Sequence, residues 1–235
     1  MLNLSQVRHD FDQRSFLFNL EIKQGSIVAL MGSSASGKST LLNLIAGFIE
    51  PISGTIEVKN VSLSRIPPNR RPFSILFQEH NLFTHLTAMD NIGLGLNSGL
   101  RFTKEEKQCI VYAAEKVGVD EVLDRLPGQL SGGQRQRVAL ARCFVQSRSI
   151  WLLDEPFSAL DPVLRYEMLI LLKSLAIERN ITVVMVTHDI SDAKLIATNL
   201  VFLVNGRVEV AFDISELSNE MTNNPFIRNF IKVVE

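Results

Sequence analysis

The stretch GSSASGKST, which begins at Gly32, has the residue types of a phosphate-binding loop. It fits the spacing G-x-x-x-x-G-K-[S/T], in which glycines let the backbone curl and point successive amide N–H groups at an anion. A continuously apolar stretch, SIVALM, comes before it, and the helical pattern KSTLLNLIAGF follows. A buried strand followed by a helix is the setting that such a loop requires, since the helix N-terminus attracts an anion. The sequence therefore predicts a nucleotide site rather than a chance glycine turn.

The residue types divide the work within this loop. The side chain of Lys38 is expected to reach the β and γ phosphates, and the hydroxyl of Ser39 to bind Mg²⁺. Backbone amides supply most of the remaining contacts. We therefore expect the nucleotide to contact Gly32, Ser33, Ser34, Ala35, Ser36, Gly37, Lys38, Ser39 and Thr40.

Two adjacent carboxylates end another apolar stretch, SIWLLDEP from Ser149. The carboxyl end of a parallel strand is where an α/β sheet opens its ligand crevice. Beside a triphosphate, Asp154 would help hold Mg²⁺ and Glu155 would act as general base on the attacking water. Without the glycine loop, the pair would more simply be a solvated turn. Trp151 is large for the interior of a buried strand, which predicts a looser edge of the core at that point.

Two more polar residues follow apolar stretches. Gln78 comes after FSILF and His188 after ITVVMVT. From neighbouring strand ends, Gln78 would contact Mg²⁺ or the attacking water, and His188 would hydrogen-bond the γ-phosphate. Each is a common turn residue when it stands alone.

A second helix start with the character of an anion site occurs at LSGGQRQRVALAR from Leu130. Ser131 and the amides of Gly132 and Gly133 are placed to cap a helix whose positive end faces an anion. Arg135 and Arg137 are two residues apart and cannot share a helix face, so we interpret them as structural or surface charges.

Strand and helix patterns alternate along most of the chain, which indicates an α/β fold with a mostly parallel central sheet. Between Ala88 and Ser147 only helical patterns occur, which predicts an inserted helical subdomain. We expect one domain over residues 1–235, with residues 1–87 and 148–235 as the α/β core and 88–147 as the helical part. Strands are predicted at SFLFNLEI, SIVALM, FSILF, SIWLL, ITVVMV and NLVFLV.

Composition narrows the classes of function. The chain has 235 residues, 46% of them hydrophobic, which is enough for one full core. Its 24 basic and 25 acidic residues leave a net charge of −1, which disfavours nucleic acid as the main partner. The longest apolar runs are far shorter than the roughly 20 residues of a membrane-spanning helix. We expect neither a nucleic-acid partner nor a membrane span.

Taken in order, these motifs resemble those of the ATP-binding subunits of ABC transporters over nearly the whole chain. GSSASGKS resembles the Walker A loop, IWLLDE the Walker B strand and LSGGQ the family signature, while Gln78 and His188 match the Q-loop and H-loop. The resemblance adds three candidates for nucleotide contact: Gln134 of the signature, Asp161 of the D-loop SALD, and Phe11 as an aromatic that stacks on adenine. It implies the fold of an ABC-type P-loop NTPase with an antiparallel β edge.

The resemblance also implies partners. Two subunits would pack head to tail as a homodimer, with each signature contacting the ATP held by the other subunit. Membrane permease subunits would dock on the dimer at the cytoplasmic face of the bacterial inner membrane, with a periplasmic solute-binding protein as an indirect partner. The segment QEHNLFTHLT, from Gln78 to Thr87, is expected to form part of the permease groove.

Longer stretches, such as LFQEHNLFTHLT and RLPGQLSGGQRQRVALARC, are most similar to the ATPase subunits of bacterial thiamine importers. This likeness favours ATP hydrolysis coupled to the import of thiamine, or its phosphates, through a separate permease. An importer of another small solute, such as a polyamine or iron, remains an alternative. A soluble ABC ATPase that acts on nucleic acid or the ribosome is a second alternative, from a different class.

Overall fold

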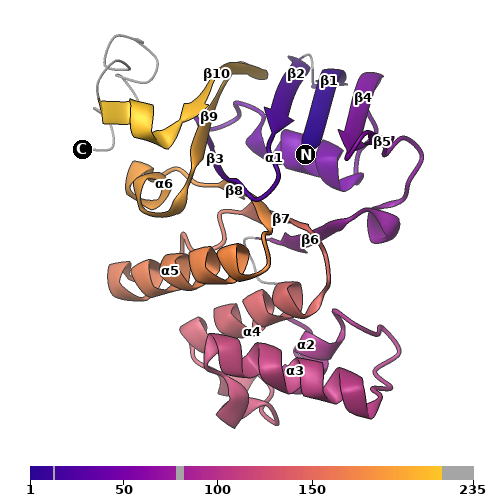
Figure 1. The fold of residues 1–235 in the computed structure, drawn as a ribbon, viewed down its shortest axis with the longest axis vertical. Coiled ribbons are helices and arrows are strands. Elements are labelled where there is room, and N and C mark those ends of the chain that lie inside the picture. Colours follow the sequence, from indigo (N-terminus) through magenta and orange to yellow (C-terminus); the bar gives the residue numbers. More distant parts are fainter. Residues whose placement is uncertain (13, 78–81, 219–235) are drawn as a thin grey trace.

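A computed structural model describes residues 1–12, 14–77 and 82–218 of the chain (Figure 1). Its strands form one mixed sheet, in the order β5-β4-β1-β2-β10-β9-β3-β8-β7-β6. The last five strands in this order, from β9 to β6, are mutually parallel. Their bounds are Ile27–Gly32 for β3, Phe73–Leu76 for β6, Ile150–Asp154 for β7, Thr182–Val186 for β8 and Asn199–Val204 for β9. The predicted parallel core is confirmed at the stretches that the sequence indicated.

The rest of the sheet is mostly antiparallel, as the predicted β edge requires. It contains β1 (Leu2–Phe11), β2 (Arg14–Ile22), β4 (Ser53–Val58), β5 (Val61–Ser62) and β10 (Arg207–Asp213). Only β2 was located from its alternation. In β1 the alternation fails because the register shifts between Leu4 and Val7, where Gln6 has a φ of +50°.

Six α-helices accompany the sheet in the described part of the chain. Their bounds are α1 Lys38–Ala46, α2 Ala88–Gly93, α3 Lys104–Val117, α4 Gly132–Val145, α5 Pro162–Glu178 and α6 Ile190–Ile196. Helices α2, α3 and α4 lie together at the far end from β1, β2 and β4, and residues 88–147 contain no strand (Figure 1). None of the described helices has both the length and the apolar character needed to cross a bilayer.

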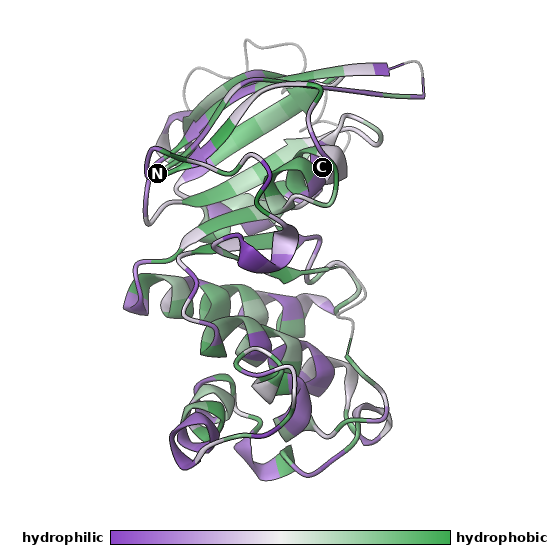
Figure 2. Cartoon of the chain, turned by 90° about the vertical axis from the view of Figure 1, so that its right-hand side faces the viewer, coloured by the Kyte–Doolittle hydropathy of each residue, from purple (hydrophilic) through white to green (hydrophobic). Residues whose placement is uncertain are grey.

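The parallel strands are buried on both faces, which explains their continuous apolar sequences. In β7, Ile150 and Leu152 belong to the hydrophobic cluster that includes α1, while Trp151 and Leu153 belong to the cluster that includes α4 and α5. Figure 2 shows the central strands as largely hydrophobic, whereas the helices carry both hydrophobic and hydrophilic residues. This two-sided core fixes the strand ends that carry the polar residues.

Trp151 corrects one expectation. Its side chain is fully buried, with 0% exposure, so the prediction of a looser core edge is wrong. The indole packs edge-on against the ring of Phe144 from α4, with the ring centroids 6.5 Å apart and the planes at 82°. The guanidinium of Arg179 lies over the Phe144 ring, 3.7 Å from its centroid. The large side chain fits because aromatic rings fill the layer between β7 and α4.

A buried arginine joins α1 to the segment that leads into β6. Arg71 donates hydrogen bonds to the carbonyl oxygens of Leu44 and Ile45, at 3.0 and 2.7 Å, and to Ile66 O at 2.9 Å. These α1 carbonyls belong to the last turn, where a positive charge also complements the helix dipole. The contact therefore fixes the helix that follows the glycine loop relative to β6.

Candidate nucleotide-binding site

The glycine loop connects β3 to α1, and two of its glycines have conformations that other residues rarely adopt. Gly32 has a φ of +147°, and a Cβ atom there would collide with Leu203 O of β9. Gly37 has a φ of +104°, and its Cβ would lie 2.9 Å from the ring of Phe16. Both positions therefore require glycine for steric and conformational reasons.

Lys38 begins α1, and its ammonium group folds back over the loop. Its Nζ donates hydrogen bonds to Gly32 O at 2.8 Å and to Ser33 O at 2.9 Å. Burial lowers the pKa of Lys38, while the negative charges of Glu155 and Asp154 act in the opposite direction. An incoming phosphate would supply this partly buried cation with a stronger acceptor than the two carbonyls.

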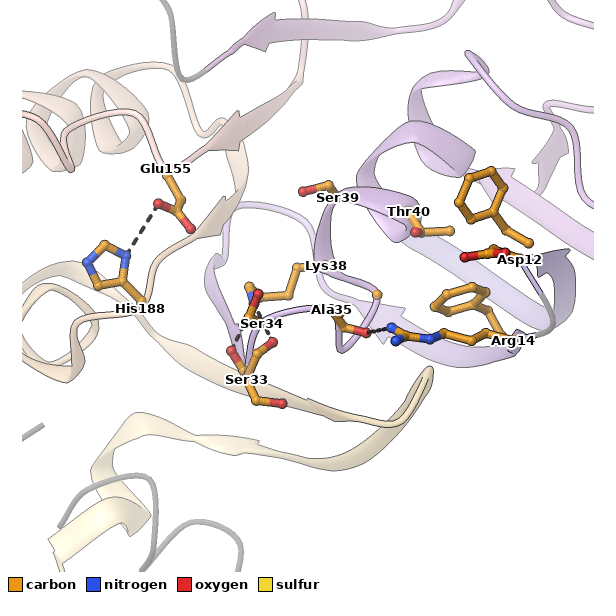
Figure 3. Close-up of a pocket in the computed structure, with 14 residues that line it drawn as sticks. Asp12, Arg14, Ser33, Ser34, Ala35, Lys38, Ser39, Thr40, Glu155 and His188 are labelled. Atoms are coloured by element: carbon orange, nitrogen blue, oxygen red, sulfur yellow. Dashed lines mark hydrogen bonds and ion pairs between the residues drawn. The ribbon is translucent and has the colours of Figure 1, made fainter. Parts of the chain in front are cut away.

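A cavity of about 590 Å³ lies over the loop (Figure 3). Glu155 and His188 border it on one side of Lys38, and Asp12 and Arg14 border it on the other. The lining residues are Phe11, Asp12, Arg14, Phe16, Gly32, Ser33, Ser34, Ala35, Gly37, Lys38, Ser39, Thr40, Glu155 and His188. The structure thus brings most of the predicted loop residues together with two of the three predicted catalytic residues.

Glu155 and His188 follow the ends of the neighbouring strands β7 and β8. His188 Nδ1 lies 3.3 Å from Glu155 Oε2. The Glu155 backbone has a φ of +44°, in the left-handed region, and its N–H donates to Val186 O at 3.2 Å. Few residues other than glycine adopt this backbone conformation, and those that do are often found in functional sites. A carboxylate paired with an imidazole at a cavity edge has the chemistry of a general base, and that role for Glu155 stays a prediction.

Asp154 and Ser39 supply oxygen atoms next to Glu155 and Lys38. Ser39 lines the cavity, whereas Asp154, the last residue of β7, is not among the lining residues. Burial raises the pKa of Asp154, with a smaller contribution in the same direction from Glu155, while a hydrogen bond from Ser39 and the charge of Lys38 lower it. Carboxylate and hydroxyl oxygens are the ligands that Mg²⁺ prefers, and it commonly takes one or two protein ligands together with substrate phosphates. These two side chains therefore fit a magnesium ion that is shared with a nucleotide.

Ser36 is not among the described residues that line the cavity, whereas Phe11 is. Ser36 is buried in the loop, and its carbonyl oxygen accepts a hydrogen bond from Gly206 N at 3.0 Å. Gln78 lies outside the described residues, so its predicted roles in catalysis and in magnesium binding stay predictions. Phe11 borders the cavity and is 69% exposed, and its stacking on adenine stays a prediction.

The LSGGQ stretch does not line this cavity. Ser131 caps α4: its Oγ accepts from Gln134 N at 3.2 Å, and Gln134 Oε1 accepts from Ser131 N at 3.0 Å. Ser131 and Gly132 are exposed, whereas Gly133 is buried. A Cβ at Gly133 would lie 2.6 Å from Leu164 Cδ2 of α5, so this glycine allows close helix packing. Nucleotide contact by Ser131, Gly132, Gly133 and Gln134 stays a prediction, and it requires a nucleotide other than the one in this cavity.

The two arginines that follow have structural partners, which confirms their interpretation. Arg135 Nη1 donates to Leu130 O at 2.7 Å. Arg137 donates to Val117 O at 2.9 Å and pairs with Glu167 at 3.0 Å.

Asp161 caps α5 and also lies outside the cavity lining. Its Oδ1 accepts hydrogen bonds from the N–H groups of Val163 and Leu164, both at 3.1 Å. The carboxylate thus has a structural task in the single subunit. Its predicted contact with a nucleotide stays a prediction.

Asp12, Arg14 and Phe16 border the cavity and were not found from the sequence. Arg14 Nη1 reaches the carbonyl oxygen of Ala35, at 3.5 Å, across the loop (Figure 3). The β1–β2 hairpin brings these residues over the glycine loop. The nearest signal in the sequence is a cation three residues after the exposed aromatic Phe11.

Comparison with known proteins agrees with this geometry. A family model described as "ABC transporter" matches residues 17–158. A curated relative from Vibrio cholerae, named thiamine import ATP-binding protein, is 62% identical over 91% of this chain and 90% of its own length. A relative of the same name from Aliivibrio fischeri is 49% identical over 100% of both chains.

Solved structures give the same family. An ATP-binding cassette, solved as a dimer in a post-hydrolysis state with ADP and Pi, is 33% identical with a TM-score of 0.77 and covers 91% of this chain and 99% of that chain. A dimeric bacterial ABC transporter cassette is 32% identical with a TM-score of 0.78, over the same shares of the two chains. The glycine loop, the strand-end carboxylates and these matches together show that the chain belongs to the ABC transporter family of ATPases.

Proposed function

We propose that this chain hydrolyses ATP to drive thiamine uptake by a bacterial importer, through separate permease subunits. The observation that carries the ATPase part is one cavity in which the phosphate-binding loop faces Glu155 and His188. The names of relatives that match at 49–62% identity support the thiamine part.

The residues of the site divide the reaction between them. Loop amides and Lys38 bind the phosphates, Glu155 takes a proton from the attacking water, and His188 orients Glu155 and contacts the γ-phosphate. Phe11 stacks on the base. Mg²⁺, held by Ser39, Asp154 and Gln78, would offset negative charge on the β and γ phosphates.

The working unit in this proposal is a homodimer that closes on two ATP molecules. The N-terminus of α4 is exposed at Ser131 and Gly132 and does not border the chain's own nucleotide cavity. A second copy, packed head to tail, would bring this capped helix end to the phosphates of its partner's nucleotide. The dimeric state of the two similar cassettes supports this arrangement.

We further propose one ABC ATPase domain over residues 1–235, with residues 88–147 as its helical part. The domain would bind peripherally at the cytoplasmic face of the inner membrane. Permease subunits would be its direct partners there, and a periplasmic binding protein an indirect one.

Thiamine uptake by cells tests the proposal. In bacteria that lack this subunit but keep the matching permease and binding protein, we expect the chain to restore uptake of radiolabelled thiamine. We expect the Lys38→Ala variant to leave uptake at background, because it removes the cation of the phosphate site. Restored uptake of iron or a polyamine instead of thiamine would contradict the proposed solute, and copurification with nucleic acid or ribosomes would favour the soluble alternative.

The permease is expected to contact the segment after β6, of which residues 82–87 are described. Leu82 packs against the hydrophobic core, whereas the side chain of Phe83 is 49% exposed. Buried Asn91 holds the backbone here: its amide group donates to the carbonyl oxygens of Phe83, Leu86 and Thr87 at 2.9 to 3.1 Å, and its Oδ1 accepts from Phe83 N at 2.8 Å. The loop therefore presents Phe83 on a fixed backbone.

Phe83→Asp should abolish binding to the permease and leave ATP binding by the isolated subunit within about twofold. The substitution places a charge in an apolar contact, whereas the Asn91 hydrogen bonds to the backbone remain. Copurification with the permease and nucleotide titration give the two readouts. Val61→Asp, at an exposed apolar residue on the opposite sheet edge, is the matched control and should keep the complex. Joint loss of folding and ATP binding in Phe83→Asp would instead assign Phe83 to the core.

A further inference from the structure

A group of charged side chains connects α5 to the short loop that carries His188. Arg165, one turn into α5, pairs with Asp192 of α6 at 2.5 Å and with Asp189 at 3.3 Å. Helices α5 and α6 lie side by side (Figure 1). The Arg165 and Asp192 side chains are 17% and 8% exposed, so this is a largely buried ion pair.

The same carboxylate holds the residue before His188. Asp192 Oδ2 accepts a hydrogen bond from Thr187 Oγ1 at 2.9 Å, and Thr187 Oγ1 accepts one from Asp189 N at 3.1 Å. Thr187 and Asp189 are therefore both tied to the Arg165–Asp192 pair, one on each side of His188. The His188 side chain itself is 56% exposed and contacts Glu155 at 3.3 Å. Its position depends on the backbone that these bonds fix.

Arg165 also faces the reactive carboxylate. Arg165, Glu155, Thr187, His188 and Asp192 all line one small cavity behind the nucleotide site. Burial lowers the pKa of Arg165, but the hydrogen bond to Asp192 and the charges of Asp192, Asp189 and Glu155 outweigh it, so the net pKa is raised. The guanidinium is therefore a fixed positive charge in this network.

We propose that Arg165 is a positioning residue for ATP hydrolysis: by clamping Asp192 and Asp189, it holds the 187–189 loop so that His188 faces Glu155 across the nucleotide site. The inference rests on the proposed ATPase function. Arg165 is on the helix that Asp161 caps, so the clamp also joins this helix to the γ-phosphate side of the cavity. A reacting geometry displaced by about 1 Å can cost on the order of a hundredfold in rate.

The test compares steady-state kinetics of purified variants. Arg165→Met should lower kcat about tenfold or more and change KM for ATP less than threefold, because the nucleotide contacts of the loop remain. Arg165→Lys keeps a charge beside Asp192 but lacks the planar fork that reaches both carboxylates, so we expect an intermediate kcat. Lys173→Met is the matched control, since Lys173 also joins α5 to α6, through Leu195 O at 3.2 Å, but away from His188. Its kcat should match the unmodified chain.

Arg165→Met leaves the charge of Asp192 buried without its cation, which could destabilise the fold. A second variant therefore separates a loss of stability from a loss of catalysis. Arg165→Met combined with Asp192→Asn removes both charges, and the oxygen of the introduced side-chain amide still accepts the Thr187 hydrogen bond. Emission from Trp151, the one tryptophan of the chain, reports folding. A folded double variant with unchanged kcat would overturn the proposal, as would an effect confined to KM.

A double-mutant cycle with His188→Ala tests whether Arg165 affects ATP hydrolysis through His188. If Arg165 acts through His188, then Arg165→Met should lower the single-turnover rate of the His188→Ala variant by less than twofold. A tenfold loss in that background would show that Arg165 acts elsewhere and overturn the proposal. Failure of the unmodified chain to hydrolyse ATP would instead contradict the proposed function.

Discussion

Glu155→Gln should reduce ATP hydrolysis on the order of a hundredfold or more while ATP binding remains. The amide keeps the shape of the side chain and its position at the end of β7, but it cannot take a proton from water. His188 and the phosphate-binding loop are unchanged, so closure on ATP should persist. Phosphate release under saturating ATP and the amount of nucleotide retained after gel filtration give the two readouts.

A glutamate outside the cavity serves as the control for the charge that Glu155→Gln removes. Glu167 is on α5, 54% exposed at its side chain, and pairs with Arg137 rather than with any residue of the cavity. Glu167→Gln should hydrolyse ATP at the normal rate. If Glu155→Gln retained a rate within threefold of the unmodified chain, Glu155 could not be the general base.

A mixed dimer should show that the signature stretch contacts the partner's nucleotide. In the first mixture, one subunit carries Lys38→Ala and the other Ser131→Arg. If each site combines one subunit's loop with the other's signature, both lesions fall in one site and the second site stays intact. We therefore expect one nucleotide to be trapped per dimer.

The second mixture places both substitutions in one subunit and pairs it with an unmodified one. Each composite site then has one lesion, so trapping should fall to background. Differentially tagged subunits make each dimer pure, and Glu155→Gln in all subunits suppresses hydrolysis. Trapping in the second mixture but not in the first would show that each signature serves its own loop. Ser131 is a suitable position because it is exposed and its side chain makes the hydrogen bond that caps α4.

The sequence predicted those parts of the site whose residues are contiguous or directly follow an apolar strand. Gly32, Lys38 and Glu155 are examples, because one strand and the turn after it determine their positions. The ring of Phe16 beneath Gly37 and the reach of Arg14 to the loop depend on how a hairpin packs across another strand. Spacing along the chain contains no information on such contacts.

Two other features escaped prediction for related reasons. The Arg165 cluster joins residues from two helices and a loop, and each is an ordinary surface charge when considered alone. The full burial of Trp151 depends on the ring of Phe144, which approaches from a different helix. The parallel core was predictable because burial on both faces leaves a continuous apolar run. The bulged strand β1 was not, since its alternation is broken.

The strand order of the core has a consequence for synthesis on the ribosome. Strand β3 precedes the phosphate-binding loop, but it pairs with β8 and β9, so that Ala29 meets Leu200 about 170 residues later. At a translation rate of about 5–20 residues per second, the ribosome completes β8 and β9 on the order of 10–30 s after β3. Until then, this apolar strand has no partner strands. Loop closure over such separations is also slow. The nascent chain therefore exposes an unpaired apolar strand throughout most of its translation, and chaperone binding in this window should raise the yield of folded subunit.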